Sequence, residues 1–226
     1  DSAVGYYTPD CAPGFASGRV EDCGSFEEFY GMFLRQYAFQ VRNKCVMLRR
    51  IEDDRRMGAY TSLLLNGTYD YILDSGLDVL RGGFPFAAYM MFAGSIPTVA
   101  DCLIAIKRLV FEKKLYSVHQ IKEAIRVNFD GYEAMRCQMA ACPKFGNDID
   151  EVDKLAADIA DHFCEWLNDY RNETGFAILP ALLGWRFLEE AYGTAATPDG
   201  RRYADPIAEH YCATPGKAVN GPTALI

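Results

Sequence analysis

The sequence lacks any long apolar run and any concentrated positive charge. Its richest apolar stretch, residues 84–96, contains proline and glycine and is shorter than the roughly 20 residues that a membrane-spanning helix needs. The 226 residues carry a formal net charge of −8, and the basic residues are interleaved with acidic and apolar ones. Nucleic-acid binding depends on clustered positive charge. We therefore expect neither a membrane nor a nucleic-acid partner.

Metal-binding and common nucleotide-binding patterns are also missing. The histidines at positions 119, 162 and 210 have no partner at metal-ligand spacing, and Cys137 and Cys142 lie too far apart for a zinc knuckle. The sequence contains no G-x-S-x-G elbow, phosphate loop or dinucleotide fingerprint. A Ser–His–Asp triad is spatial, so spacing leaves that arrangement open. We expect no metal site and no permanently bound cofactor.

The chain contains eight cysteines, and several of them fall inside helical patterns, where a free cysteine acts as a small buried hydrophobe. With no signal peptide visible at the start, the composition favours free thiols in the cytoplasm. The chain begins at Asp1 without a methionine and ends on an apolar stretch at Ile226. This pattern indicates a segment of a larger protein, with a processed native terminus as the alternative.

Residue patterns predict a chain rich in helix. Residues 1–24 read as loop, and Ser25-Phe-Glu-Glu28 is a capping box that opens a long helix. Three further boxes are expected to open the helices that follow them, at Thr98-Val-Ala-Asp101, Ser117-Val-His-Gln120 and Asp148-Ile-Asp-Glu151. The expected helices cover residues 60–73 (with Gly76 as the C-cap), 99–114, 118–128, 132–141 and about 149–172.

Two apolar segments, within residues 80–97 and 175–183, have the character of buried strands. From residue 193 the chain is loop-like, with turn residues at Thr197-Pro-Asp-Gly200. The order of elements is typical of an α/β fold. Two apolar strands alone do not form a sheet covered on both faces, so we expect the rest of the sheet to lie outside this chain.

Four stretches, in order along the chain, resemble the glycyl radical enzymes of the pyruvate formate-lyase-like family. Arg81-Gly-Gly83 matches a glycine pair that opens a barrel strand, and residues 98–111 match a helix that reads DSLAAIKKLVF in the family. Residues 143–148, followed by Val152-Asp153, match PKYGNDDDYVD. The fourth stretch is Ala196-Thr-Pro-Asp-Gly-Arg201, followed by Gly221-Pro-Thr-Ala224.

The resemblance implies part of a ten-stranded α/β barrel that consists of two antiparallel halves, each with five parallel strands. This chain would form much of the helix-rich second half-barrel, incomplete without flanking segments. Residues 25–226 would supply helices and barrel strands, and the glycyl radical domain would be absent. Two departures are visible. Phe84-Pro-Phe-Ala87 replaces a more polar family sequence, and the Gly-Pro-Thr-Ala ending is closer to the dehydratase, decarboxylase and C–N lyase branches.

The resemblance also implies a chemistry. In the family, a glycyl radical installed after translation abstracts hydrogen from a cysteine, and the thiyl radical attacks a small-molecule substrate. A separate activating enzyme, which uses S-adenosylmethionine and an iron–sulfur cluster, installs the radical, and the intact protein is expected to be a homodimer. Neither the glycine motif nor the cysteine motif occurs in this sequence, so we expect no catalytic residue here. The alternative is an inert scaffold or partner half-domain.

The matched motifs suggest supporting residues instead. Gly82 and Gly83 would let the backbone approach the barrel interior, and Phe84, Phe86 and Leu182 are candidates for the substrate wall, with plain core packing as the alternative. The second set of candidates supports loops. Asn147 and Asp148 are expected to cap a helix N-terminus, and Thr197, Asp199 and Arg201 to hold a loop by charge-assisted hydrogen bonds. For these five residues a purely structural role is the alternative.

Overall fold

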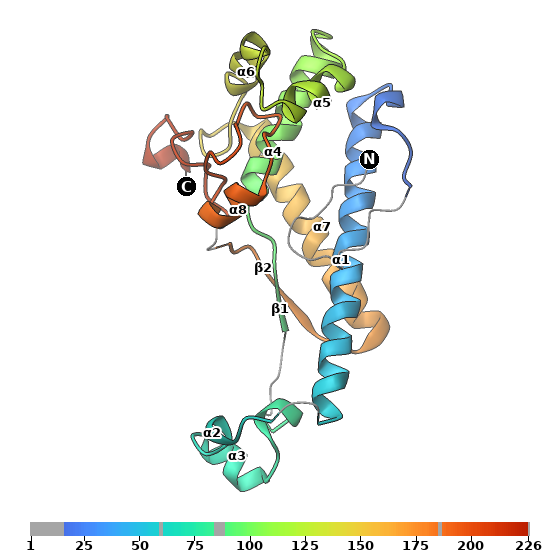
Figure 1. Ribbon diagram of the computed structural model, residues 1–226, viewed down its shortest axis with the longest axis vertical. Coiled ribbons are helices and arrows are strands. Elements are labelled where there is room, and N and C mark those ends of the chain that lie inside the picture. The colour runs from blue at the N-terminus through green and yellow to red at the C-terminus, as the bar shows by residue number, and fades with distance from the viewer. Residues whose placement is uncertain (1–15, 59–60, 84–88, 185–186, 226) are drawn as a thin grey trace.

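The computed structural model describes residues 16–58, 61–83, 89–184 and 187–225 (Figure 1). The long helices are α1 (Phe26–Arg56), α4 (Ile96–Ile106) and α7 (Asp150–Thr174), and α4 continues into the π-helical segment η3 (Lys107–Glu112). The shorter helices are α2 (Leu63–Asn66), α3 (Asp70–Ser75), α5 (Val118–Arg126), α6 (Glu133–Ala140) and α8 (Phe187–Gly193). Three 3-10 turns complete the described helical structure: η1 (Val20–Asp22), η2 (Val79–Arg81) and η4 (Pro222–Leu225).

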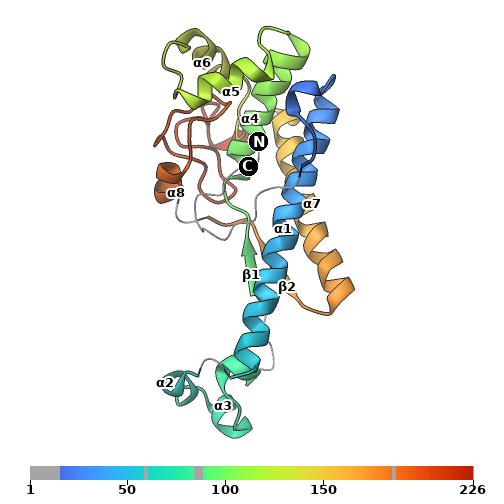
Figure 2. The ribbon, with the colours of Figure 1, turned by 45° about the vertical axis from the view of Figure 1, so that its right-hand side comes forward.

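Both expected strands are present, as β1 (Tyr89–Phe92) and β2 (Ile178–Ala181), and they pair in parallel. Helices α1 and α7 lie together on one side of this pair (Figures 1 and 2). Met91 and Ile178 face these helices and are buried in the main core. On the alternate positions, the side chains of Met90, Phe92 and Leu179 are about half exposed, at 50%, 46% and 48%. The described sheet therefore has one buried apolar face and one apolar face that is about half exposed.

Two of the four expected capping boxes operate at helix starts. Ser25 accepts from the backbone N–H of Glu28, although the Glu28 carboxylate reaches back to Gly24 rather than to Ser25. Ser117 and Gln120 form the reciprocal box at the start of α5. The prediction for Thr98-Val-Ala-Asp101 was wrong, because α4 already begins at Ile96 and both side chains are buried in contacts with distant loops. Tertiary hydrogen bonds have replaced the local ones there.

The prediction for Asp148-Ile-Asp-Glu151 was also wrong. The N-cap of α7 is Ile149, which has no side-chain capping bond, and Glu151 pairs instead with Lys107 and Arg108 of η3. The single helix expected over residues 60–73 is two short helices, α2 and α3. Gly76 ends α3 in the left-handed conformation, as predicted. Asp78 accepts hydrogen bonds from Thr61 and Asn66, which closes this small unit at the far end of α1 (Figure 1).

The carboxyl ends of β1 and β2 come together through two glycines. A Cβ placed on Gly94 would lie 3.2 Å from the Cα of Gly184, and one on Gly184 would lie 3.1 Å from the Cα of Gly94. Just beyond, the Ser95 N–H donates to the carbonyl of His210, and the His210 N–H donates to the carbonyl of Gly184. The C-terminal loop is therefore attached to both strand ends. In the described ranges, no helix is long and apolar enough to cross a membrane.

We predict that Gly94→Ala destabilises the protein by about 1–3 kcal/mol, because the added methyl group must push the two strand ends apart. The midpoint of urea unfolding measures this change. Gly67→Ala is the matched control, since Gly67 has φ −77° and its added Cβ would meet nothing closer than 3.6 Å. Equal midpoints for Gly94→Ala and the unsubstituted protein would contradict the close approach of the strands.

Candidate functional site: the Thr-Pro-Asp-Gly-Arg turn and the cavity beside it

The turn at residues 197–201 is closed by its own backbone and side chains. The Thr197 N–H donates to the Arg201 carbonyl at 3.0 Å, and the Gly200 N–H donates to the Thr197 carbonyl at 3.1 Å. The Thr197 hydroxyl donates to Asp199 Oδ1 at 2.5 Å and accepts from Arg201 Nε at 3.1 Å. The side chains of Asp199 and Arg201 thus meet through one hydroxyl rather than in a direct ion pair, and the Arg201 N–H also donates to Asp199 Oδ1 at 3.4 Å.

Arg201 connects this turn to the segments on both sides of it. Its side chain is buried, and its guanidinium donates to the carbonyls of Thr194, Ala195, Arg202 and Asp205. Burial lowers the pKa of Arg201, and the nearby Asp199 opposes that shift. One cation therefore satisfies several carbonyl groups of a segment that has no regular secondary structure.

Helix α4 forms the inner wall against which the turn packs. Cys102 donates its thiol hydrogen to Asp199 Oδ1, with an S···O distance of 3.6 Å, and burial raises the pKa of this thiol well above its usual range. The preceding residue, Asp101, accepts from the Phe145 N–H at 2.7 Å. Two adjacent residues of one helix thereby hold two separate loops.

Asp101 and Asp199 are fully buried, and each keeps one carboxylate oxygen without a protein hydrogen-bond partner, Oδ2 in both cases. Burial raises the pKa of Asp101 to about 7. The negative charge of Asp199 adds to this shift, and Lys144 and Lys217 oppose it. A carboxyl group with this pKa exchanges a proton near neutrality. Sequence reasoning missed Asp101 and Cys102 because both lie inside the matched helix, where the pattern indicated capping and core packing.

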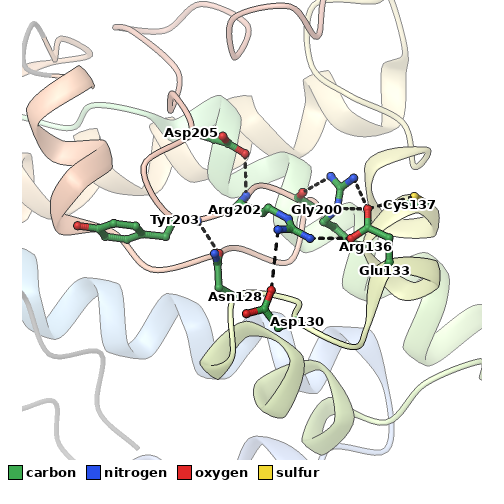
Figure 3. A network of polar contacts seen from close by, with 9 residues as sticks. All are labelled: Asn128, Asp130, Glu133, Arg136, Cys137, Gly200, Arg202, Tyr203 and Asp205. Atoms are coloured by element: carbon green, nitrogen blue, oxygen red, sulfur yellow. Dashed lines mark hydrogen bonds and ion pairs between the residues drawn. The ribbon is translucent and has the colours of Figure 1, made fainter.

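The outer side of the turn is covered by α6 (Figure 3). A Cβ on Gly200, where φ is +89°, would lie 2.8 Å from backbone atoms of Arg136 and Ala140, so only glycine fits at this position. Glu133 accepts from Arg136 and from Arg202 at the surface, and these cations hold the pKa of Glu133 at about 2. Arg136 also reaches the Gly200 carbonyl. The turn is therefore enclosed between α4 and α6.

Asn147 holds the loop at residues 217–220, whereas its position in the sequence suggested that it caps a helix. The side-chain amide donates to the carbonyls of Lys144 and Lys217, and its oxygen accepts from the N–H groups of Val219 and Asn220. The expected helix-capping role of Asn147 was wrong, because these contacts attach residues 217–220 instead. Asp148 is exposed with φ 55° and does not cap α7.

The residues proposed for the substrate wall do not gather in one place within the described structure. Gly83 is buried against Ile72 and Leu77, where an added Cβ would lie 2.6 Å from Ile72 Cδ1, and Gly82 is a left-handed residue that ends η2. Leu182 is partly buried against the main core. Phe84 and Phe86 lie outside the described residues. The role of these residues toward a substrate stays a prediction.

A cavity of about 1090 Å³ opens beside the turn, between α1, α4 and the segments 16–21 and 194–207. One wall is aromatic, with Phe29, Phe33 and Tyr37 of α1, and the facing wall carries the polar groups of Thr98, Cys102 and Thr197. Cavities with a largely apolar lining and a few fixed polar groups are typical of small-molecule sites. Within the described part of the chain, no cluster of three or more His, Cys, Asp or Glu side chains is placed to hold a metal ion.

Comparison with known proteins identifies the family. A family model described as "Pyruvate formate lyase-like" matches residues 11–187, and the chain belongs to this family. It is 30% identical to trans-4-hydroxy-L-proline dehydratase from Clostridioides difficile, over 94% of this chain and 27% of that protein.

Solved structures agree with this assignment. The chain superposes on the B12-independent glycerol dehydratase from Clostridium butyricum with a TM-score of 0.82 and 29% identity, over 94% of this chain and 27% of that one. It also superposes on a glycyl radical enzyme from Archaeoglobus fulgidus, with a TM-score of 0.77 and 26% identity over 88% of this chain and 26% of that one. The expected resemblance and the partial-barrel fold are confirmed, and the chain spans about a quarter of the length of these relatives.

We predict that Asp101→Asn removes a contribution to stability that falls with pH between about pH 4 and pH 7, so that the stability of the variant relative to the unsubstituted protein rises across this window. The folded-state pKa of Asp101 is raised from 3.8 to about 7, so its contribution is present at low pH and is lost as the pH rises through this window. The loss amounts to about 1 kcal/mol per pH unit. The measurement is the difference in unfolding free energy between the two proteins at each pH, since other carboxyl groups act in the opposite direction.

Asp150→Asn is the control for this experiment, because the Asp150 side chain is 82% exposed and its pKa is lowered by Lys154. The stability of this variant relative to the unsubstituted protein should not rise between pH 4 and pH 7. A difference curve for Asp101→Asn that does not change with pH would show that Asp101 is not protonated in the folded protein near neutrality.

We predict that Arg201→Lys destabilises the protein by about 3–5 kcal/mol, since one ammonium group does not satisfy the carbonyls that the guanidinium now binds. Arg202→Lys, whose side chain is 39% exposed, should cost less than about 1 kcal/mol. Chemical denaturation measures both. Equal losses for the two variants would contradict the central role of Arg201 in holding the loop.

Proposed function

We propose that this chain is part of the barrel of a glycyl radical enzyme that cleaves a C–O, C–C or C–N bond in a small metabolite. The observation that carries the proposal is the parallel β1–β2 pair with a half-exposed apolar face, in a chain that matches one stretch of known family barrels. Dehydration is the favoured reaction, because two of the similar proteins are named as dehydratases.

We assign the half-exposed sheet face to the barrel interior. Met90, Phe92 and Leu179 would form an apolar wall that excludes water and oxygen from the radical. The turn at residues 197–201 follows β2 and α8 in the sequence and is enclosed by α4 and α6. It would therefore provide rigid support for neighbouring loops. Gly82, Gly83, Phe84, Phe86 and Leu182 remain candidates for further contacts with the substrate.

The radical-bearing glycine and the thiyl cysteine are proposed to belong to other parts of the intact enzyme. The radical would be installed after translation by an activating enzyme that uses S-adenosylmethionine and an iron–sulfur cluster. A homodimer in the cytoplasm is the expected form of the intact protein. The competing proposal is an inert scaffold or partner half-domain, which is favoured by the lack of both motifs in this sequence.

We predict that the intact protein, incubated without oxygen with its activating enzyme and S-adenosylmethionine, develops a glycyl radical signal in electron paramagnetic resonance. It should then dehydrate a small hydroxylated metabolite, detected as the carbonyl or unsaturated product by mass spectrometry. Phe92→Ala should lower kcat/KM for that substrate while leaving the radical yield unchanged, because the ring belongs to the proposed wall.

Leu188→Ala on α8 is the matched control, since Leu188 is 55% exposed and lies outside the sheet. A protein that never develops the radical under these conditions would favour the scaffold. A Phe92→Ala protein with full activity would exclude this sheet face from the substrate site.

A further inference from the structure

A continuous series of aromatic rings runs along α1 and crosses to α7. Phe26, Tyr30, Phe33 and Tyr37 stack in sequence, with ring centroids 5.9, 6.0 and 5.9 Å apart. Tyr37 then meets the edge of Trp166, with centroids 5.4 Å apart and planes at 83°. Tyr37 and Trp166 are therefore in direct ring contact, and one phenylalanine ring lies between Tyr30 and Tyr37.

Tyr30 is the member of the series with a built proton acceptor. Its hydroxyl donates to Asp158 Oδ2 at 2.5 Å, from α1 to α7. The Asp158 side chain is 50% exposed, and its carboxylate lies 3.8 Å from His162 Nε2. Loss of an electron makes a phenol strongly acidic, so a carboxylate already in place lets the proton leave together with the electron. Tyr30 is therefore the favoured end point for oxidation.

Tyr37 connects the series to the cavity. Its side chain lines the cavity wall that faces Cys102 and Thr197, and burial raises the pKa of its hydroxyl to about 12. Ring contacts of this kind also stabilise cores by packing alone. Packing does not require hydroxyl groups at positions 30 and 37, nor a carboxylate paired with Tyr30, and these are the groups that one-electron chemistry uses.

We propose that Trp166, Tyr37 and Tyr30 form a one-electron relay that carries oxidising equivalents away from the cavity to the Tyr30–Asp158 pair near the surface. A peroxyl radical in the cavity gains one electron from Tyr37, which lines the cavity, and becomes a hydroperoxide anion. Tyr37 recovers an electron from the series that it shares with Trp166 and Tyr30, and Tyr30 is the final donor. The phenolic proton of Tyr30 moves to Asp158, which leaves a neutral tyrosyl radical beside a protonated carboxyl group.

A small thiol then completes the cycle. It transfers a hydrogen atom to the Tyr30 oxygen and becomes a thiyl radical in solution, and Asp158 releases its proton to water. The relay would thus protect the protein from stray radicals without consuming any side chain. This inference goes beyond the proposed function, and its test needs neither the activating enzyme nor the substrate.

The test uses the intact protein with photo-excited tris(bipyridine)ruthenium(II) and persulfate as the one-electron oxidant. Transient absorption and freeze-quenched electron paramagnetic resonance would follow the tryptophanyl and tyrosyl radicals. We expect the tryptophanyl signal to decay as a tyrosyl signal grows. Tyr30→Phe, which keeps the ring, should remove the long-lived tyrosyl component, and Asp158→Asn, which keeps the shape, should slow its appearance several-fold.

Tyr192→Phe is the matched control, because Tyr192 is 65% exposed on α8 and should leave both signals unchanged. Trp166→Phe should remove the part of the tryptophanyl signal that feeds Tyr30. Circular dichroism confirms that each variant is folded before photolysis. If the tyrosyl signal is the same in Tyr30→Phe as in the unsubstituted protein, the relay does not exist and the aromatic series is packing alone.

Discussion

The parallel pairing of β1 with β2 determines where the other elements lie. The two strands are separated in sequence by α4, η3, α5, α6 and α7, so their pairing closes a long loop whose helices must return to the same edge. The long helix α7 provides that return and packs on both α1 and α4. The glycines at positions 94 and 184 then let the strand ends meet, which fixes the starting point of every loop that follows.

The segment after α8 depends on this arrangement, because apart from the 3-10 turn η4 its described part has no regular secondary structure of its own. Its backbone groups are satisfied by side chains from the helices and from the turn itself. Thr98 accepts from the Ala208 N–H and bonds the Thr214 hydroxyl, Asn147 binds residues 217–220, and Arg201 binds carbonyls on both sides of its turn. One polar residue of α4 and two polar residues of loops therefore position the C-terminal segment at the edge of the sheet.

This dependence also explains which features the sequence could predict. Helix periodicity is local, so α5, α6 and α7 were predicted to within a few residues and the start of α1 was predicted correctly. Both strands lie inside longer predicted apolar segments. Ser25 and Ser117 act as caps because their hydroxyl groups accept local backbone N–H groups, from Glu28 and Gln120. The same four-residue pattern at Thr98 and Asp101 failed, since both side chains bind segments more than forty residues away. The spacing of residues along the sequence does not show such distant partners.

The candidate site shows the same division. Thr197, Asp199 and Arg201 were singled out by the family motif, and they are in contact in the structure. Their neighbours Asp101 and Cys102 were not predicted, because a carboxyl group and a thiol on a helix give no sequence signal of burial. The half-exposed sheet face was inferred only indirectly, from the small number of strands.

Burial of Asp101 and Asp199 costs free energy that a surface turn would not require, and each retains an oxygen without a protein partner. Apolar residues of similar size would stabilise packing at least as well. What the carboxylates add is directional: Asp101 fixes the backbone at Phe145, and Asp199 fixes Thr197 and the thiol of Cys102. Hydrogen-bonded buried carboxyl groups specify a loop geometry that apolar contact leaves open. The polar cluster therefore fixes the positions of the loops around α4 at the expense of total stability.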